Sequence, residues 1–430
     1  MVRLVMSQKF VVNGGNRLQG SIRPAGNKNA ALPMIAATLL TDEPCVLKNV
    51  PRIEDVTYLL ELVTDLGASY EWVTGDSLRI DAGNVSPKTL NRELCSRIRA
   101  SILLAGPMLG RFREVRLPPP GGDVIGRRRV DTHFLAFQGL GAEVEVGADY
   151  SVKAKKLQGA EIFLDEPSVT GTENALMAAV LAEGVTTLRN AASEPHVQDL
   201  ANGLASMGAR IDGIGTNVLR IEGVEKLGGA EMVVGPDHIE VGSFIGLAAV
   251  TDSQITIEGV RGSDLHSILL NFEKLGIEPR LKDGSLIVEA SQEKRIRSDI
   301  GGHIRKIEDG PWPAFPADLT SIAIVVATQC TGLLMIFEKM FESRLFFVDK
   351  LVGMGAQIIL CDPHRVIISG PSKLHGSTLE SPDIRAGMAV LIAALAAEGR
   401  SEIHNIGQID RGYEEIDTRL RQLGADIQRQ

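Results

Sequence analysis

Six basic side chains stand at equivalent places along this sequence of 430 residues. Each lies at or just before the start of a helical pattern: Lys28, Arg99, Arg128, Arg344, Arg385 and Arg411. A helix N-terminus attracts anions through its free N–H groups and its dipole, and arginine adds charge-assisted, often bidentate hydrogen bonds. The alternative interpretation is that helix starts simply collect charged residues at the surface. Six cations at corresponding positions favour a site for a small, highly charged anion.

Four carboxylates lie near these cations in the sequence and could move protons: Asp123, Asp318, Glu342 and Asp383. We expect Glu342 and Asp383 to orient neighbouring arginines. Asp123 and Asp318 are the better candidates for general acid and general base. Asp123 belongs to the stretch PPPGGDVIGRRRVDTH, in which prolines, two glycines and three arginines follow one another closely. That composition predicts a mobile loop over 117–129.

The composition argues against several other kinds of chemistry. A net charge of −9 and an aromatic content of 4% do not suit a nucleic-acid surface. The eight histidines show no HxxxH or HExxH spacing, so we expect no metal site. Neither GxxxxGK[ST] nor GxGxxG follows a strand pattern, so a nucleotide triphosphate or dinucleotide site is not expected. The sequence therefore predicts small-molecule partners and no cofactor.

The cysteines and the apolar runs predict a cytoplasmic protein. Cys45, Cys95, Cys330 and Cys361 stand far apart, as free thiols in a reducing compartment do. The first residues lack the apolar core and cleavage site of a secretory signal. The longest apolar run, 321–341, is interrupted by polar residues and falls short of the roughly 20 residues of a membrane span. No membrane partner is expected, and a monomer is assumed.

The elements that position these residues form a six-fold repeat. The tripeptides LGA, MGA or LGI recur with their glycines at 67, 141, 208, 276, 355 and 424. An amphipathic helical pattern precedes each glycine, a short strand pattern follows it, and a nearly all-apolar helix lies earlier in each copy. An all-apolar helix is buried on every side. The sequence thus predicts two α/β domains of three βαβαββ units each, with a crossover at Pro236-Asp237.

The repeats also permit an internal comparison. Eleven residues before each glycine stand Val56, Val130, Val197, Leu265, Arg344 and Tyr413. Four copies carry an aliphatic residue there, whereas the fifth carries Arg344. This pattern predicts a functional residue that could be removed with little loss of stability. Because helices of such units point the same way, the sequence predicts that their N-termini converge on a cleft between the two domains.

The sequence resembles the enolpyruvyl transferases along essentially its whole length. The resemblance is carried by GNKNAALP (26–33), RASILLAGP (99–107), PGGDVIGRR (120–128), PSVTGTENALMAA (167–179), PAFPADL (313–319), FESR (341–344), DIRA (383–386) and IDRGYEEI (409–416). It implies two inside-out α/β domains, of residues 1–27 with 236–430 and of residues 28–235, with the active site between them. It also implies transfer of the enolpyruvyl group of phosphoenolpyruvate to the 3-hydroxyl of UDP-N-acetylglucosamine, with release of phosphate. That reaction begins peptidoglycan synthesis.

The resemblance assigns roles to individual residues. Lys28, Arg128, Arg344 and Arg411 would bind phosphoenolpyruvate, with Arg99 and Arg385 nearby. Asp318 would take the proton of the sugar hydroxyl, while Asp123 or Lys28 would deliver a proton to carbon. Contacts to the sugar nucleotide would come from Asn29, Arg128, Asp131, His133, Ser168 and Val169.

Four departures from the family pattern bear on these roles. Asp123 replaces the usual loop cysteine, which fosfomycin alkylates in other members, so we expect insensitivity to that drug. Leu103 replaces a frequent tryptophan, Gln408 a frequent histidine, and Thr170-Gly171 a pair of small residues. Two alternatives stay open: a sister enzyme acting on shikimate 3-phosphate or another nucleotide, and a catalytically silent anion-binding paralogue.

Overall fold

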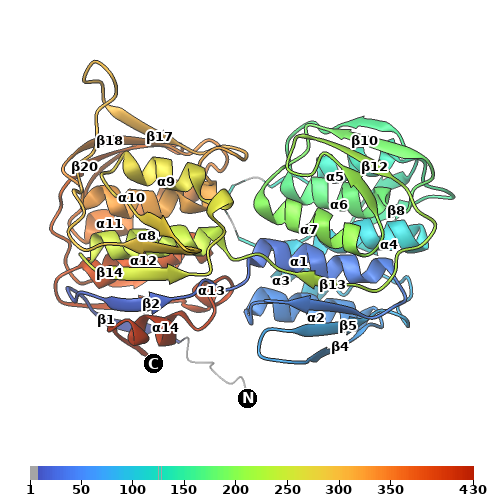
Figure 1. Cartoon of the computed structure of the whole chain (residues 1–430), viewed down its shortest axis with the longest axis horizontal. Helices are drawn as coiled ribbons and strands as arrows, with labels where there is room; N and C mark the ends of the chain where they lie inside the picture. The colour runs from blue at the N-terminus through green and yellow to red at the C-terminus, as the bar shows by residue number, and fades with distance from the viewer. Residues whose placement is uncertain (1–7, 124, 127) are drawn as a thin grey trace. The chain divides into compact units, whose positions relative to one another are not determined.

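The computed structural model describes residues 8–123, 125–126 and 128–430. The described residues form two compact units (Figure 1). The first unit holds residues 8–25, 125–126 and 236–430, and the second holds 26–123 and 128–235. Residues 26 and 27 thus group with the second unit, and residues 125–126 group with the first. The boundaries expected from the sequence had placed 26 and 27 in the first unit and 125–126 in the second. Among the described residues, no helix is long and apolar enough to cross a bilayer.

The second unit contains the following elements: α1 (Lys28–Ala37), η1 (Thr38–Leu40), β3 (Cys45–Lys48), α2 (Glu54–Asp65), β4 (Ser69–Trp72), β5 (Leu78–Asp81), α3 (Arg92–Arg97), η2 (Arg99–Leu104), α4 (Ala105–Phe112), β6 (Glu114–Leu117), α5 (Asp131–Gly139), β7 (Glu143–Val146), β8 (Tyr150–Lys153), β9 (Glu161–Phe163), α6 (Val169–Ala179), β10 (Val185–Arg189), α7 (Pro195–Ser206), β11 (Arg210–Asp212), β12 (Val218–Glu222) and β13 (Glu231–Val233).

The first unit contains the remaining elements: β1 (Phe10–Asn13), β2 (Gln19–Ile22), α8 (His238–Val250), β14 (Gln254–Glu258), η3 (Gly262–Asp264), α9 (His266–Glu273), β15 (Arg280–Lys282), β16 (Ser285–Val288), β17 (Arg305–Glu308), η4 (Ala317–Leu319), α10 (Thr320–Thr328), β18 (Gly332–Phe337), η5 (Arg344–Phe347), α11 (Val348–Gly353), β19 (Gln357–Asp362), β20 (Arg365–Gly370), β21 (Thr378–Glu380), α12 (Ile384–Ala396), β22 (Arg400–His404), α13 (Gly407–Asp410), α14 (Ile416–Gln422) and β23 (Asp426–Arg429).

The predicted βαβαββ repeat is seen most plainly in the third copy, which runs β9, α6, β10, α7, β11 and β12. Its sheet has the order β11-β12-β10-β9, with β9 parallel to β10 and the other neighbours antiparallel. The second copy departs from this plan and forms a three-stranded sheet, β6-β8-β7. Its first strand is reduced to one parallel bridge between Thr89 and Arg116. Pro87 lies just before that bridge and has no N–H to donate to a ladder.

Where the chain passes from one unit to the other, the strand before the passage pairs within the unit that the chain is leaving. β2 pairs in parallel with β14, although it leads into α1 of the second unit. β13 pairs in parallel with β3, although it leads into α8 of the first unit. The second passage occurs at Pro236-Asp237, the predicted crossover. β1 closes the sheet of the last repeat, lying between β22 and β23.

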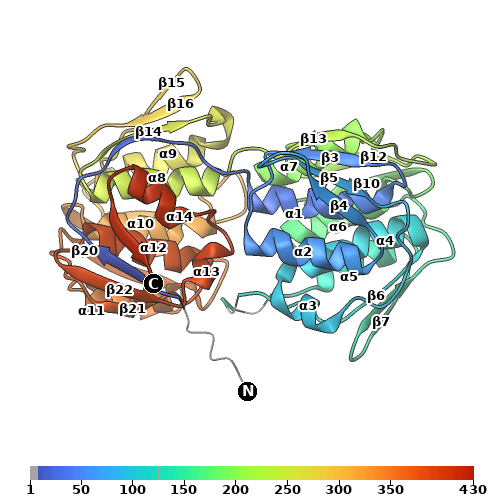
Figure 2. The same cartoon turned by 90° about the horizontal axis from the view of Figure 1, so that it is seen from below.

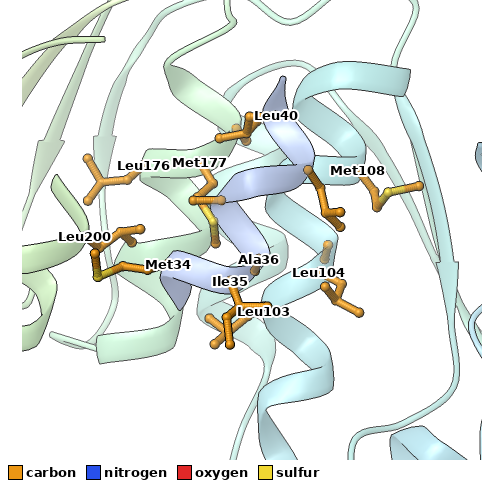
Figure 3. Close-up of a cluster of buried hydrophobic side chains, with 14 of the residues drawn as sticks. Met34, Ile35, Ala36, Leu40, Leu103, Leu104, Met108, Leu176, Met177 and Leu200 are labelled. Atoms are coloured by element: carbon orange, nitrogen blue, oxygen red, sulfur yellow. The ribbon is translucent and has the colours of Figure 1, made fainter. Parts of the chain in front are cut away.

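In each unit the apolar helices lie inside and the sheets outside, which confirms the predicted fold class (Figures 1 and 2). Every residue of α8 and α10 is buried. The core of the second unit packs α1, η2, α4 and α6 against one another around Ile35, Leu104 and Met177 (Figure 3). All six repeat glycines have a positive φ, between 74° and 112°, as expected after a helix C-terminus.

Candidate functional site

Asp318 stands between two buried arginines in the first unit. Nη2 of Arg344 lies 3.1 Å from Oδ1 of Asp318, and Nε of Arg385 lies 3.0 Å from Oδ2. The side chains of the two arginines are 3% and 6% exposed, whereas that of Asp318 is 27% exposed. Two guanidinium groups at hydrogen-bond distance favour the ionised carboxylate, the form that a general base needs. The structure thus brings three of the predicted site residues together.

Arg385 is held at the start of α12 by local contacts. Asp383 caps that helix, and its Oδ1 accepts hydrogen bonds from the backbone N–H groups of Arg385 and Ala386. The guanidinium also lies over the ring of Tyr413, at 5.5 Å. Burial by itself lowers the pKa of Arg385, but Asp318, Tyr413 and Asp237 raise it above its ordinary value. Nη1 of Arg385 is buried and donates to no described group.

Glu338 is an acidic neighbour of Arg344 that the sequence did not point out. Its Oε2 lies 3.8 Å from Nε of Arg344, and its side chain is 0% exposed. Burial raises the pKa of Glu338 to about 8, although the positive charge of Arg344 opposes the shift. Glu338 also accepts backbone hydrogen bonds from Met340 and Phe341, so it fixes the turn that leads to Arg344. Its only signal in the sequence is an acid ending an apolar strand.

Arg411 follows α13, and Nη1 donates to Oε1 of Gln408 at 2.9 Å. Gln408 is one of the departures from the family pattern, and here it orients a predicted phosphoenolpyruvate-binding arginine. Leu103, another departure, is 2% exposed and belongs to the apolar core of the second unit. Its replacement of a tryptophan is therefore a packing change within that core.

Lys28 begins α1 in the second unit and forms an ion pair with Asp55. Nζ lies 2.8 Å from Oδ2, and the two side chains are 12% and 6% exposed. Asn27 caps the helix by accepting hydrogen bonds from the N–H groups of Asn29 and Ala30. Asp55 was missed in the sequence because an acid in the first turn of an amphipathic helix is common at the surface.

Arg99 begins η2 and holds the end of the predicted loop 117–129. Its Nη2 donates to the carbonyl oxygens of Arg128 and Arg129, each at 2.8 Å. Burial, together with the charge of Arg128, lowers the pKa of Arg99 to about 10. Arg128 itself is half-buried. Two predicted anion-binding residues therefore lie side by side.

The start of that loop packs closely on the segment before η2. A Cβ on Gly121 would meet the Ser96 carbonyl oxygen at 1.8 Å, and one on Gly122 would meet Cβ of Arg99 at 2.8 Å. The two glycines are thus required because the backbone approaches these atoms closely. In the sequence, the same glycines had instead indicated flexibility. Asp123 follows them and is half-buried. Loop mobility stays a prediction, and the loop residues Val124 and Arg127 lie outside the described residues.

Of the residues predicted to contact the sugar nucleotide, Asn29 lies on α1 and Arg128 precedes α5, and the other four lie on α5 or at the start of α6. Asp131 is exposed and accepts a hydrogen bond from Nε of Arg129 at 3.1 Å. Ser168 caps α6, with Oγ accepting from the N–H of Gly171, and Val169 is the first residue of the helix. His133 is only 1% exposed. Both of its ring nitrogens are engaged, Nδ1 by Asn174 at 2.7 Å and Nε2 by Thr170 at 3.2 Å.

Two further features of the described residues concern metal ligands and a surface groove. No group of three or more His, Cys, Asp or Glu side chains is gathered there so as to hold a metal ion. A surface groove is lined by residues of β6, β7 and β8, and none of the site residues named above lines it. Its charged side chains pair with one another, Arg116 with Asp149 and Lys153 with Glu114.

Comparison with known proteins assigns the family. The family model of EPSP synthase (3-phosphoshikimate 1-carboxyvinyltransferase) matches residues 12–420. The chain therefore belongs to the EPSP synthase family of enolpyruvyl (carboxyvinyl) transferases. Among solved structures, the enolpyruvyl transferase NikO from Streptomyces tendae superposes with a TM-score of 0.86 at 24% identity, covering 98% of this chain and 99% of that one. EPSP synthase from Acinetobacter baumannii gives a TM-score of 0.75 at 18% identity, covering 99% and 100%. At these identities the likeness shows a shared fold.

Sequence relatives place the chain more narrowly within the family. A UDP-N-acetylglucosamine 1-carboxyvinyltransferase of Bradyrhizobium diazoefficiens is 61% identical over 421 residues, covering 98% of each chain. One of Treponema denticola is 55% identical over 420 residues, covering 98% of this chain and 99% of the relative.

Proposed function

We propose that the protein transfers the enolpyruvyl group of phosphoenolpyruvate to the 3-hydroxyl of UDP-N-acetylglucosamine, releasing phosphate. One observation carries the proposal: the Asp318 carboxylate lies between two buried guanidinium groups, and Nη1 of Arg385 is a buried donor with no described partner. A buried, unpartnered donor is costly unless a ligand completes its hydrogen bonds. Phosphoenolpyruvate supplies both a carboxylate and a phosphate for such donors.

The anion would be bound by cations that the two units contribute separately. We assign Arg344, Arg385 and Arg411 of the first unit, and Lys28, Arg99 and Arg128 of the second. The active site that we propose uses both sets, which agrees with the family's two-domain architecture. Arginine suits this task because its planar fork matches both carboxylate and phosphate oxygens, and it stays charged when buried.

The reaction needs addition followed by elimination. Asp318 takes the proton of the sugar 3-hydroxyl as its oxygen attacks C2 of phosphoenolpyruvate, while an acid protonates the methylene carbon. The resulting tetrahedral intermediate then loses a proton from the new methyl group, and phosphate leaves from C2, which restores the double bond. The arginines hold the negative charge of the departing phosphate. We assign the protonation at carbon to Asp123 or Lys28.

The sugar nucleotide would lie against the second unit. We assign its binding to Asn29, Arg128, Asp131, His133, Ser168 and Val169. Since His133 is buried and both ring nitrogens are bonded, it would act through Thr170. In the cell, this reaction would be the first committed step of peptidoglycan synthesis, carried out by a cytoplasmic monomer.

The experiment that tests the function is phosphate release from phosphoenolpyruvate with a panel of acceptors. We expect release with UDP-N-acetylglucosamine and none with shikimate 3-phosphate or with no acceptor. Release with shikimate 3-phosphate alone would establish the sister activity instead. No release with any acceptor, from folded protein, would favour a silent anion-binding paralogue.

A further inference from the structure

Asn174 forms three hydrogen bonds that fix the orientation of its side-chain amide. Oδ1 accepts from the backbone N–H of Gly106 at 2.7 Å, and Nδ2 donates to the carbonyl oxygen of Ile102 at 2.9 Å. A backbone N–H can only donate and a backbone carbonyl can only accept, so the amide has one orientation that satisfies both. Asn174 is 0% exposed. A Cβ on Gly106 would come within 2.7 Å of Oδ1, so this approach requires a glycine.

This orientation determines which nitrogen of His133 carries the proton. The third bond of Asn174 joins Nδ2 to Nδ1 of His133 at 2.7 Å. Because Nδ2 is an NH₂ group, it must donate, and Nδ1 must be the unprotonated acceptor. The proton of the neutral ring is then on Nε2. Burial, with a smaller contribution from the charge of Arg99, lowers the pKa of His133 to about 3, so the ring stays neutral at working pH.

The chain of hydrogen bonds continues to the surface of the second unit. Nε2–H of His133 donates to Oγ1 of Thr170 at 3.2 Å, and Thr170 is half-buried in the first turn of α6. Because Thr170 Oγ1 accepts this bond, its own hydrogen is not used in it and can donate to a ligand. Ser168 is in the same position, because its Oγ accepts from the N–H of Gly171 at 3.2 Å. Two hydroxyl donors thus stand two residues apart.

We propose that Asn174, acting through His133, fixes Thr170 as a hydrogen-bond donor to a diphosphate oxygen of the sugar nucleotide. Asn174 and His133 are positioning residues in this arrangement, and Thr170 is the residue that contacts the ligand. Phosphate oxygens only accept hydrogen bonds, so they match a pair of hydroxyl donors. The proposal rests on the function proposed above and adds to it a residue that selects for the diphosphate.

The tautomer is tested on the free protein, without substrate. In ¹⁵N-histidine-labelled protein, long-range ¹H–¹⁵N spectra should show His133 protonated at Nε2 only, unchanged from about pH 5 to about pH 9. The signal is assigned by its loss in His133→Gln. In Asn174→Asp the carboxylate can only accept, so the proton should appear on Nδ1. A wild-type ring protonated at Nδ1, or one that titrates near pH 6.5, overturns the proposal.

The ligand contact is tested by titration calorimetry with UDP-N-acetylglucosamine, UDP and uridine. Thr170→Val should weaken binding of both diphosphates by roughly tenfold or more, as loss of a hydrogen bond to a charged group does, and leave uridine binding unchanged. Thr170→Ser should restore it, and Thr187→Val, on β10, should behave as wild type. Equal binding of UDP by Thr170→Val and wild type would overturn the contact. If the wild type binds UDP but not UDP-N-acetylglucosamine, the function proposed above fails while the diphosphate contact stands.

Discussion

Nη2 of Arg344 lies 3.1 Å from Oδ1 of Asp318, and the arginine of this pair is 3% exposed. The pair joins a cation that can bind the substrate anion to a carboxylate that can take the sugar proton. Arg344 occupies a repeat position that is aliphatic in four other copies, and its side chain is buried as theirs would be expected to be. We therefore expect Arg344 to affect both activity and stability.

Arg344→Ala should reduce kcat/KM by about 10²–10³-fold, the loss typical of one removed electrostatic donor. The sequence predicted little effect on stability, but Arg344 is buried and donates a hydrogen bond to the Asp318 carboxylate, so we expect a loss of about 2 kcal/mol, as when a hydrogen bond to a charged group is removed. Steady-state kinetics and chemical denaturation measure the two effects. Arg344→Lys is the charge-retaining control. Unchanged stability of the alanine variant would show that the buried guanidinium is not needed for folding.

Asp55→Asn should disturb Lys28, because it removes the carboxylate 2.8 Å from the lysine ammonium group. We expect the KM for phosphoenolpyruvate to rise and the free energy of unfolding to fall by about 3 kcal/mol. The neighbouring Glu54 is exposed, so Glu54→Gln is the matched control and should match the wild type. An Asp55→Asn variant with wild-type affinity and melting temperature would remove Asp55 from the account.

The difference in stability between Glu173→Gln and wild type should shift in favour of the variant as pH rises. Burial, together with Glu194, raises the pKa of Glu173 well above its ordinary 4.5, so the folded protein holds this proton more tightly than the unfolded chain. The associated stability is present below about pH 4.5 and is lost as pH rises through the folded pKa. Melting temperatures at several pH values measure the difference, with exposed Glu183→Gln as control. A difference that does not grow with pH would contradict a protonated Glu173.

The wild type should resist fosfomycin, because the carboxylate of Asp123 is a far poorer nucleophile than a thiolate. Asp123→Cys should be inactivated by the drug, and Asp123→Asn should be nearly inactive if Asp123 is the general acid. The measurement is residual activity of the three proteins after incubation with and without fosfomycin. A fully active asparagine variant would transfer the acid role to Lys28.

Local patterns allowed much of the fold to be predicted. Each repeat glycine follows an amphipathic helix and adopts a positive φ, and a helix apolar on all sides can only be an interior helix. The second copy shows the limit of such patterns, since its first strand is reduced to a single bridge at Thr89. A bridge of that length leaves no periodic signal.

The site was predictable where residue types repeat and unpredictable where contacts join distant segments. Arg344 and Arg385 could be chosen as anion-binding candidates from their positions, and they do meet at Asp318. Asp55 and Asn174 were missed because each meets its partner across separate helices. His133 was predicted to contact the ligand, and its burial against a neighbouring helix could not be read from its own segment.

The central claim is tested most directly by identifying the product formed by wild type and by Asp318→Asn. NMR and mass spectrometry of the wild-type reaction with phosphoenolpyruvate and UDP-N-acetylglucosamine should show an enolpyruvyl ether at the sugar 3-oxygen, with one phosphate released for each ether formed. Asp318→Asn should bind both substrates and form neither product. Phosphate released without the ether, or an ether formed at a normal rate by Asp318→Asn, would contradict the account.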